Sequence, residues 1–573
     1  MNWLALAILL SADSAPVADF RFQDHRGAGR SLAELADKKA VVVAFLGVEC
    51  PLARQYAVRL AELAAKYEPR GVAFLALDPN EQDGVTAIGH AAKAAKILFP
   101  FGKDVGNAIA DRFGAERTPE VFVLDGKRGI VYRGRVDDQF GVGYQRPQPT
   151  AQYLKDALEA VLAGKAPAIA KTEAVGCRIG RARSADAKAG VTFAKDVAPI
   201  FNRRCVECHR AGAIGPMALS DPKDVRGWAE MILEVVDEGR MPPWHADAPS
   251  GVFKNDPRLS AGEKETIRKW VKAGAPAGDP KDLPPAPSFG DGWRIPKPDV
   301  VLSMAKPFAV PAQGAVQYQY FEIPTNFTED RWVSAAEARP GNRAVVHHII
   351  VFVKPPGGRG NTATPGAGQE WLTATAPGTP PMRLEQGFAK FVPKGSTLIF
   401  QMHYTPNGTP QTDRSGVGLV FADPKTVRRE MLTTMSRNMT FELKPRLAGQ
   451  VVESSQKLPK DVMLYSYFPH MHLRGQAFRY EAILPDGKRE TLLDIPRYDF
   501  AWQQSYELTK PRFLPAGTVM RCIAKFDNSE SNLSNPNPRA TVKWGDQTYE
   551  EMMAGYFDVT FVGQDLTRSR AAK

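Results

Sequence analysis

The stretch Cys205-Val206-Glu207-Cys208-His209 holds two thiols and an imidazole within five residues. This C-x-x-C-H spacing is typical of covalent haem attachment, in which both thiols join the haem vinyl groups and the adjacent His ligates iron. Half of a zinc site is the competing interpretation, but the other three cysteines lie far away in the sequence. We therefore predict haem c bound through Cys205 and Cys208, with His209 as one axial ligand.

A second axial ligand is available in Gly239-Arg240-Met241-Pro242-Pro243-Trp244. The prolines restrict the backbone around Met241, and Met/His ligation raises the potential of a haem. The alternatives are that Met241 fills a core, or that His245 is the ligand instead. We expect Met241 to ligate the iron.

Five of the nine histidines fall in the C-terminal half, each in a β-type run beside apolar residues. His470 and His472 are an i, i+2 pair, so on a strand both imidazoles leave the same face and can hold one ion. His347 and His348 are adjacent, so they share an ion only if their strand bends or if they use different ring nitrogens. Imidazoles suit copper or zinc, and a nearby thioether such as that of Met552 favours Cu(I). The alternative is that each is an ordinary hydrogen-bonded core histidine.

Cys50 precedes Pro51 at the predicted start of a helix, after the buried strand Val41-Val42-Val43-Ala44-Phe45-Leu46. A helix N-terminus lowers the pKa of a thiol and makes its thiolate available. Cys177 is the one plausible resolving partner before the haem motif. We expect a Cys50–Cys177 disulfide, which is either redox-active or structural.

The region around Cys50, residues 19–165, resembles the α/β thioredoxin-like or redoxin fold. The resemblance is carried by the strand, the Cys-Pro helix start and the later Thr118-Pro119 before another strand, and it implies a cis proline facing the cysteine. Ala53 replaces the second cysteine of C-x-x-C, so exchange within that motif is excluded. The positions of the peroxidatic pattern hold Val43 and Gly47. A degenerate docking module is therefore an alternative.

The helices predicted on either side of the haem motif resemble those of an all-α class I cytochrome c domain, over residues 191–279. One apolar face precedes the motif, and a capping box opens a helix that stops at Gly274. The first face consists of Val197, Ile200 and Phe201, the box is Ser260-Ala261-Gly262-Glu263, and its helix presents Ile267, Trp270 and Val271.

The histidine motifs occur in the order found in the copper type II, ascorbate-dependent monooxygenases, which include peptidylglycine hydroxylase and dopamine β-hydroxylase. These motifs are His347-His348, Gln401-Met402-His403-Tyr404, Pro469-His470-Met471-His472 and Glu551-Met552. The resemblance implies two tandem all-β jelly-roll sandwiches, 299–425 and 426–573, each holding one copper ion across a water-filled cleft. It implies an electron-relay copper on His347, His348 and His403. It also implies an oxygen-binding, catalytic copper on His470, His472 and Met552.

This region departs from that family in two ways. Animal members carry several disulfides, whereas this region has only Cys522. Phe468 stands where peptide-amidating members place an arginine, so the anchor for a glycine-extended peptide is missing. Tyr556 either faces the substrate or fills the core.

Composition sets the outer limits. A chain of 573 residues predicts three or four domains, and its net charge of +11 is scattered, which excludes a dense nucleic-acid patch. The sequence contains no run of eighteen apolar residues, so it predicts no membrane-spanning helix. Residues 1–18 resemble a signal peptide, with the apolar run 3–10 followed by small residues. Residues 166–190 read as a polar linker and 280–298 as a Pro-rich spacer rather than structure.

We therefore predict an exported redox protein, periplasmic or secreted, with three modules, haem c and two copper ions. It would hydroxylate a C–H bond of a small substrate with O2, using electrons from its own haem. A cytochrome, a quinol-linked chain or an ascorbate-like reductant would be the external donor. The alternatives are a non-catalytic haem and copper protein for electron transfer or metal handling, and a thiol-disulfide redox protein acting through Cys50.

Overall fold

The computed structural model describes residues 15–146, 148–181, 183–186, 188–210, 215–288, 292–312, 316–357, 370–376, 379–406 and 410–567. These residues form two compact units. The first contains 15–210, 215–237 and 261–284, and the second contains 238–260 and 285–567. The predicted signal peptide lies almost wholly outside the described residues.

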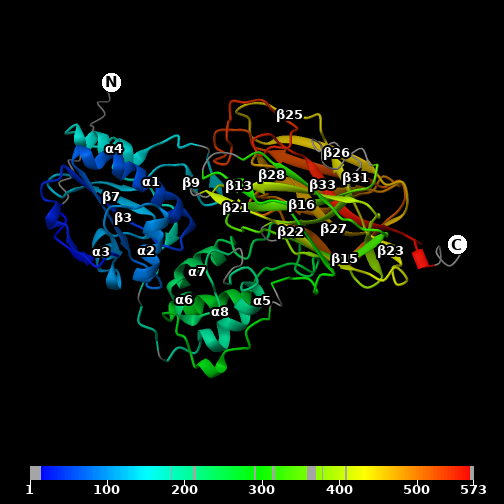
Figure 1. Ribbon diagram of the computed structural model, residues 1–573, viewed down its shortest axis with the longest axis horizontal. Coiled ribbons are helices and arrows are strands. Elements are labelled where there is room, and N and C mark those ends of the chain that lie inside the picture. The colour runs from blue at the N-terminus through cyan, green and yellow to red at the C-terminus, as the bar shows by residue number, and fades with distance from the viewer. Residues whose placement is uncertain are drawn as a thin grey trace, which may run out of the picture. The chain divides into compact units, whose positions relative to one another are not determined.

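The first unit is built on a five-stranded mixed sheet in the order β5-β4-β3-β7-β8 (Figure 1). Its central strands are buried on both faces, which explains their continuous apolar sequence. Helices α1 and α4 lie on one side of the sheet, and α3 packs into the core on the other. The strands are β3 (Ala40–Phe45), β4 (Val72–Asp78), β5 (Phe101–Lys103), β7 (Glu120–Leu124) and β8 (Ile130–Gly134), and the helices are α1 (Pro51–Tyr67), α2 (Val85–Ala94), α3 (Ala108–Phe113) and α4 (Tyr153–Leu162).

This sheet and its helices confirm the predicted thioredoxin-like α/β domain. The helix begins at Pro51 directly after Cys50, and the Thr118–Pro119 peptide is cis as expected. A short strand, β6 (Arg117–Thr118), precedes this proline and pairs with β11 (Cys177–Arg178), from the stretch predicted to be a linker. The predicted linker is therefore partly structural.

The rest of the first unit is a group of short helices around the C-x-x-C-H motif. Phe193, Phe201 and Trp270 bring the helices before and after the motif together, with ring centroids 5.9 Å apart for the first two and 6.0 Å for Phe193 and Trp270. The capping-box helix is present with its predicted face buried. The helices are η4 (Phe193–Val197), α5 (Ala198–Arg204), α6 (Pro222–Gly227), α7 (Ala229–Asp237) and α8 (Ala261–Lys272).

The second unit is largely β, as predicted. Its first two larger sheets share one apolar core and run β12-β22-β15-β19-β23, with β18 beside β15, and β14-β20-β16-β17. Their strands are β12 (Val300–Ser303), β14 (Gln319–Pro324), β15 (Arg331–Arg339), β16 (Val346–Lys354), β17 (Glu370–Thr375), β18 (Met382–Arg383), β19 (Phe388–Val392), β20 (Thr397–Tyr404), β22 (Gly416–Phe421) and β23 (Arg429–Glu430).

Two further sheets, β24-β33-β27-β30 and β26-β31-β28-β29, share a second core. Two-stranded pairs β13-β21 and β25-β32 complete the unit. The strands are β13 (Phe308–Val310), β21 (Gln411–Asp413), β24 (Leu432–Arg437), β25 (Glu442–Leu443), β26 (Gln450–Lys457), β27 (Val462–His470), β28 (Gly475–Ile483), β29 (Arg489–Ile495), β30 (Tyr506–Leu514), β31 (Val519–Phe526), β32 (Val542–Lys543) and β33 (Ala554–Phe561).

The finer prediction of two tandem jelly-roll sandwiches is not confirmed. The region consists of separate, mostly four-stranded sheets, the size of the blades in propeller-like arrangements. Strand β23 also pairs with β19 although it lies beyond the predicted boundary at residue 425. The predicted boundary therefore does not coincide with the sheets.

Two stretches outside residues 299–573 also belong to the second unit. Residues 238–260, predicted to be the methionine loop of the cytochrome segment, contribute Trp244 and Phe253 to the second β core. The end of the predicted Pro-rich spacer is structured as well, because Ile295 is buried and the Arg294 backbone N–H donates to Glu337 Oε2 at 2.5 Å. Apolar side chains, and not proline content, decide where these stretches pack.

None of the helices that the structure describes combines the length and the apolar character needed to cross a bilayer.

Candidate redox sites

Cys50 lies at the N-terminal end of α1 with extended backbone geometry, and its side chain is fully buried. Its thiol donates to the carbonyl oxygen of Thr118 at 3.0 Å, directly before the cis proline. The strand-to-helix turn and the cis peptide thus bring residues 68 positions apart into contact. This is the arrangement expected from the thioredoxin-like resemblance.

Cys177 reaches the same place through β11, where it stands opposite Thr118 in the antiparallel pairing. Gly176 allows this close approach, because a Cβ at that position would lie 2.1 Å from the Thr118 carbonyl oxygen. None of the five cysteines is in a disulfide in this structure. The two thiols that the sequence paired are therefore neighbours.

The surroundings of Cys50 favour its thiolate. Burial by itself raises the pKa of Cys50, but hydrogen bonds with the Cys177 thiol and the backbone N–H groups of Ala53 and Cys177 outweigh it and lower the pKa to about 7. A large fraction of Cys50 is then thiolate at neutral pH, which is the nucleophilic form.

A carboxylate from helix α7 holds the Cys177 strand in place. Glu234 Oε2 lies 2.9 Å from Arg117 Nη2 and 2.5 Å from Arg178 Nε, so it bridges β6 and β11. Burial raises the pKa of Glu234, but hydrogen bonds from the two guanidinium groups lower it below the usual range. Sequence reasoning missed this bridge, because no local pattern relates Glu234 to Cys177.

The residues predicted to attach haem follow directly on helix α5. A tight turn carries them, with the backbone N–H of His209 donating to the Cys205 carbonyl oxygen at 2.9 Å. His209 Nδ1 lies 3.3 Å from the carbonyl oxygen of Met217. If Nδ1 is the protonated nitrogen, this bond leaves Nε2 for a metal, as is usual for iron- and zinc-bound histidines.

The imidazole of His209 is closely packed and desolvated. Gly215 lies so close to the imidazole that a Cβ there would be 2.5 Å from His209 Nδ1, so the turn holds the ring tightly. Desolvation lowers the pKa of His209 and keeps it neutral, as an iron ligand must be. Met241 and His245 both lie in residues 238–260 of the second unit, so the second axial ligand stays a prediction.

The imidazoles of His347, His348 and His403 form a cluster whose ligand nitrogens all lie within 4.8 Å of one another. His348 stands opposite His403 in the β16–β20 pairing, and a bulge between Val346 and His348 shifts the register. The bulge is the bend that the adjacent histidines required. The structure therefore brings together the first predicted ligand set.

The second set gathers at the end of β27. His470 Nδ1 lies 2.8 Å from Gln503 Oε1, and the ring centroids of His470 and His472 are 5.2 Å apart. His470 pairs with Ala554 at the start of β33, two residues after Met552, whose side chain is buried. The Glu551 carboxylate fixes the turn by accepting from the backbone N–H of His472 at 2.8 Å and of Arg474 at 2.6 Å. Sequence reasoning missed Gln503, and it named Glu551 only as part of the motif with Met552, without this role.

The two imidazole sets are closer than the family resemblance implied. His348 and His470 have ring centroids 6.4 Å apart, and the ring of Tyr318 contacts His348, His403 and His472. Phe500 stacks on His347 with centroids 5.2 Å apart. The expected water-filled cleft between two separate sites is thus replaced by one aromatic-lined cluster of five imidazoles.

These imidazoles fit a soft or borderline metal ion. Three buried ring nitrogens have no hydrogen-bond partner in the described residues: His348 Nε2, His403 Nδ1 and His472 Nε2. Desolvation lowers the pKa of His347 to about 4 and that of His470 to about 4, so these rings are neutral at physiological pH. Buried, neutral, unpartnered imidazole nitrogens are what copper or zinc requires.

Comparisons with known proteins concern the N-terminal domain. The profile of the AhpC/TSA family matches residues 13–133. Curated relatives described as thiol-disulfide oxidoreductase ResA include one from Bacillus thuringiensis subsp. konkukian, 27% identical, and one from Bacillus anthracis, 29% identical. Each match extends over 117 residues, which is 20% of this chain and 62% of the relative. The chain thus spans less than two thirds of these relatives.

Similar solved structures each cover less than a third of this chain. A hypothetical protein from Sinorhizobium meliloti 1021 is 32% identical over 29% of this chain and 92% of its own, with a TM-score of 0.27. A secreted Mycobacterium tuberculosis disulfide oxidoreductase, homologous to E. coli DsbE, is 20% identical over 25% of this chain and 95% of its own, with a TM-score of 0.20. The N-terminal domain is a thioredoxin-like redoxin domain, similar to thiol-disulfide oxidoreductases.

Proposed function

We propose that the N-terminal domain carries out thiol-disulfide exchange through Cys50 and Cys177. The observation that carries this proposal is the contact between the two thiols beside cis-Pro119, with the pKa of Cys50 lowered to about 7. The similarity to proteins described as thiol-disulfide oxidoreductases supports it.

The exchange proceeds in two balanced steps. The Cys50 thiolate attacks one sulfur of a partner disulfide, which forms a mixed disulfide and releases the partner's other sulfur as a thiolate that takes up a proton. The Cys177 thiolate then attacks Cys50 sulfur, releases the second partner sulfur and leaves a Cys50–Cys177 disulfide. Two thiols lose two electrons and the partner disulfide gains them.

Trapping the mixed disulfide tests this function. The Cys177→Ser variant, incubated with a small peptide disulfide, is expected to accumulate a mixed disulfide at Cys50 that the wild-type chain resolves. Cys522→Ser is the control, because Cys522 is buried in the second β core. Absence of both the trapped species and a Cys50–Cys177 disulfide in mass spectra would exclude the mechanism.

A second function is favoured by the imidazole cluster. We infer that it holds copper, with His347, His348 and His403 as one ligand set and His470, His472 and Met552 as the other, and that the chain hydroxylates a C–H bond. The convergence of ligand nitrogens within 4.8 Å carries this inference. Copper would supply the one-electron redox and dioxygen chemistry that these side chains lack.

The chain's own groups have definable roles in this reaction. Each substrate C–H becomes C–OH while O2, two electrons and two protons yield one water. Gln503 orients His470, and Glu551 holds the backbone of His472, so both imidazoles stay in place as the metal changes charge. Phe500 and Tyr318 exclude water from the cluster.

Metal analysis tests the copper assignment. Two copper ions per chain are expected, with one lost in His348→Ala and the other in His472→Ala, while substrate hydroxylation is read as a mass increase of one oxygen atom. If the chain retains no copper, or if neither substitution changes its copper content, the copper assignment is wrong. The cluster would then be a non-catalytic site or a site for another metal.

The C-x-x-C-H residues complete the proposal. We infer that Cys205 and Cys208 bind haem c covalently with His209 as a ligand, that Met241 is the second ligand with His245 as its alternative, and that the haem passes electrons to the copper cluster. The proposed covalent haem agrees with the export predicted from residues 1–18. A pyridine haemochrome spectrum that persists after acid extraction is expected, and it should disappear in a Cys205→Ala/Cys208→Ala variant.

A further inference from the structure

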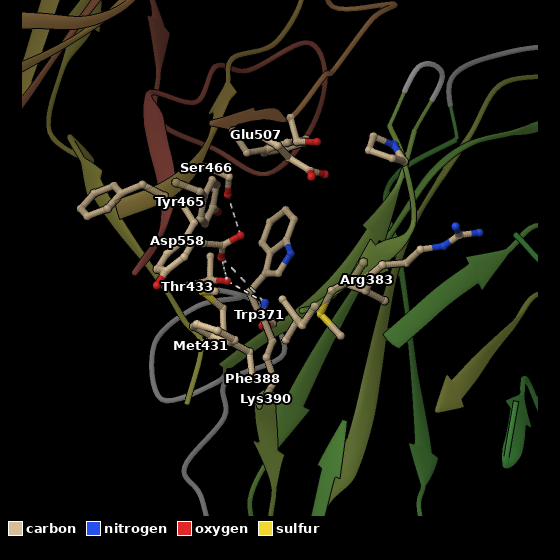
Figure 2. A pocket seen from close by; sticks show the side chains of 18 of the residues that line it. Trp371, Arg383, Phe388, Lys390, Met431, Thr433, Tyr465, Ser466, Glu507 and Asp558 are labelled. Carbon is tan, nitrogen blue, oxygen red and sulfur yellow. Dashed lines mark hydrogen bonds and ion pairs between the residues drawn. The ribbon is translucent and has the colours of Figure 1, made fainter. Parts of the chain in front are cut away.

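The second unit contains a pocket of about 130 Å³ between the strands β17, β18 and β19 of the first core and β24, β27, β30 and β33 of the second. An engineered cavity of about 150 Å³ binds one benzene molecule, so this volume is on the scale of a single ring. Figure 2 shows the pocket with Trp371 near its centre.

One wall carries a buried polar network. The Lys390 ammonium donates to Thr433 Oγ1 at 2.7 Å and to the carbonyl oxygens of Trp371 and Leu372 at 3.0 and 3.1 Å. All three of its protons are therefore used, and the side chain has no donor left for a ligand. Burial lowers the pKa of Lys390, which Asp558 partly offsets.

Asp558 is the member of this network that remains able to accept. Its Oδ1 accepts from Thr433 at 2.5 Å and lies 3.9 Å from Lys390 Nζ, and its Oδ2 accepts from Ser466 at 2.7 Å. Each carboxylate oxygen can accept a second bond, and 30% of the side chain is exposed. In Figure 2 the carboxylate lies beside the Trp371 indole, whereas Arg383 extends away from it.

The charges around the pocket balance. Three lining residues are cationic and three are anionic, so no net field favours a charged ligand. The cationic residues are Lys254, Arg383 and Lys390, and the anionic residues are Glu385, Glu507 and Asp558.

Aromatic rings give the pocket a flat apolar surface. Trp371 lies with ring centroids 4.7 Å from Tyr556 and 5.3 Å from Phe468. Ser466, Phe468 and His470 alternate along β27, and they pair with Asp558, Tyr556 and Ala554 on β33. Residues two apart share a face, so this ladder leads from Asp558 towards His470 over about 13 Å.

We propose that this pocket binds a neutral, single-ring organic molecule whose hydroxyl group donates to Asp558 and whose ring lies against Trp371 and Phe468. A carboxylate ligand is disfavoured because Lys390 has no donor left, and an ammonium gains little because Lys390 already neutralises Asp558. If the copper function holds, the far end of the ligand points along the ladder towards His470.

Binding of four small probes to the full-length chain, as purified and under nitrogen without reductant, tests the proposal by calorimetry. Benzyl alcohol carries the donor, benzyl methyl ether lacks it, and benzylamine and benzoate carry opposite charges. Benzyl alcohol is expected to bind about tenfold to a hundredfold more tightly than the ether, because the hydrogen bond is to a charged acceptor.

Two variants locate the site. Lys390→Met/Asp558→Leu removes the charge pair together, which avoids an orphan charge, and is expected to abolish the preference for the alcohol while the chain stays folded. Phe468→Trp fills the pocket and is expected to abolish binding of every probe. Val451→Ala, an exposed substitution outside the pocket lining, is the control and should leave all affinities within about twofold.

Tighter binding of benzylamine or benzoate, failure of all four probes to bind, or binding that survives Phe468→Trp would each overturn the proposal. No copper, O2 or reductant takes part in the measurement. Failure of the proposal therefore leaves the proposed hydroxylation standing, and failure of hydroxylation leaves the binding result standing.

Discussion

The pKa of Cys50 is lowered by hydrogen bonds, chiefly with Cys177, against the effect of complete burial. The reactive form of the cysteine therefore depends on one neighbouring residue. The C-x-x-C cysteine that would normally assist is Ala53 here, and Cys177 supplies the partner thiol from a strand 127 residues later in the chain (177 minus 50).

A titration measures this dependence. The thiolate absorbance of the reduced wild-type chain minus that of reduced Cys50→Ser reports the Cys50 thiolate. This difference is expected to rise with pH with a midpoint of about 7 instead of the ordinary 9.0. Cys177→Ala should move this midpoint up towards the ordinary value, whereas Cys177→Ser, which keeps a donor, should move it less. If neither substitution changes the midpoint, Cys177 does not lower the pKa of Cys50.

The same shift has a consequence for stability. Between pH 7 and pH 9 the folded chain holds fewer protons at Cys50 than the unfolded chain, so the free energy of unfolding rises with pH across this window. The gain between these two pH values is on the order of 2 kcal/mol; the stabilisation is fully present above the unfolded pKa and is lost as the pH falls through about 7. Chemical unfolding of the reduced chain at pH 7 and pH 9, compared with Cys50→Ser, measures it.

At the scale of elements, strand β11 decides whether the two thiols meet. Gly176→Ala is expected to push β11 off β6, because the new Cβ would lie 2.1 Å from the Thr118 carbonyl oxygen. The Cys50–Cys177 disulfide should then form at least about tenfold more slowly, measured by quenched mass spectrometry, because the sulfurs lose alignment.

Gly190→Ala provides the matched control for this substitution. Gly190 is exposed, a Cβ added there would have no atom within 4 Å, and its backbone geometry is ordinary. The Gly190→Ala variant should therefore form the Cys50–Cys177 disulfide at the wild-type rate. Equal rates in both variants would show that β11 does not set the thiol geometry.

The regular elements were predictable where local pattern decides them. The buried strand before Cys50, the helix at Pro51 and the capping-box helix with Ile267 and Trp270 follow from apolar periodicity. The pairing of His470 with His472 likewise follows from strand alternation. These features depend only on residues close together in the sequence.

Features set by tertiary packing were not predictable. The bridge of Glu234 to β6 and β11 and the merging of two imidazole sets around Tyr318 and Phe500 join residues far apart in the chain. The same holds for residues 280–298, where proline content suggested a spacer although Ile295 is buried. Sequence pattern shows that a side chain is apolar, but not which core it joins.

At the scale of the whole molecule, residues 238–260 belong to a unit different from that of the helices on both sides of them. Trp244 packs against Tyr506 with ring centroids 4.9 Å apart, in the second β core. Trp244→Ala is therefore expected to destabilise the second unit by about 3–5 kcal/mol, although in the sequence the residue lies between two segments of the first unit. Thermal unfolding of the full chain measures this effect.

Val252→Ala is the control within the same segment, since Val252 is 36% exposed and its truncation should cost less than about 0.5 kcal/mol. A Trp244→Ala variant whose second unit melts at the wild-type temperature would show that the segment does not contribute to that core.

Within the residues that the structure describes, the chain crosses between its two units at residues 237/238, 260/261 and 284/285. A single proteolytic nick at any one of these crossings would leave the units joined, because residues 238–260 stay packed in one unit and 261–284 in the other. Separation requires more than one cut. For a protein proposed to work outside the cell, where proteases are abundant, this threading is a redundant connection that keeps the two units in the same particle after damage.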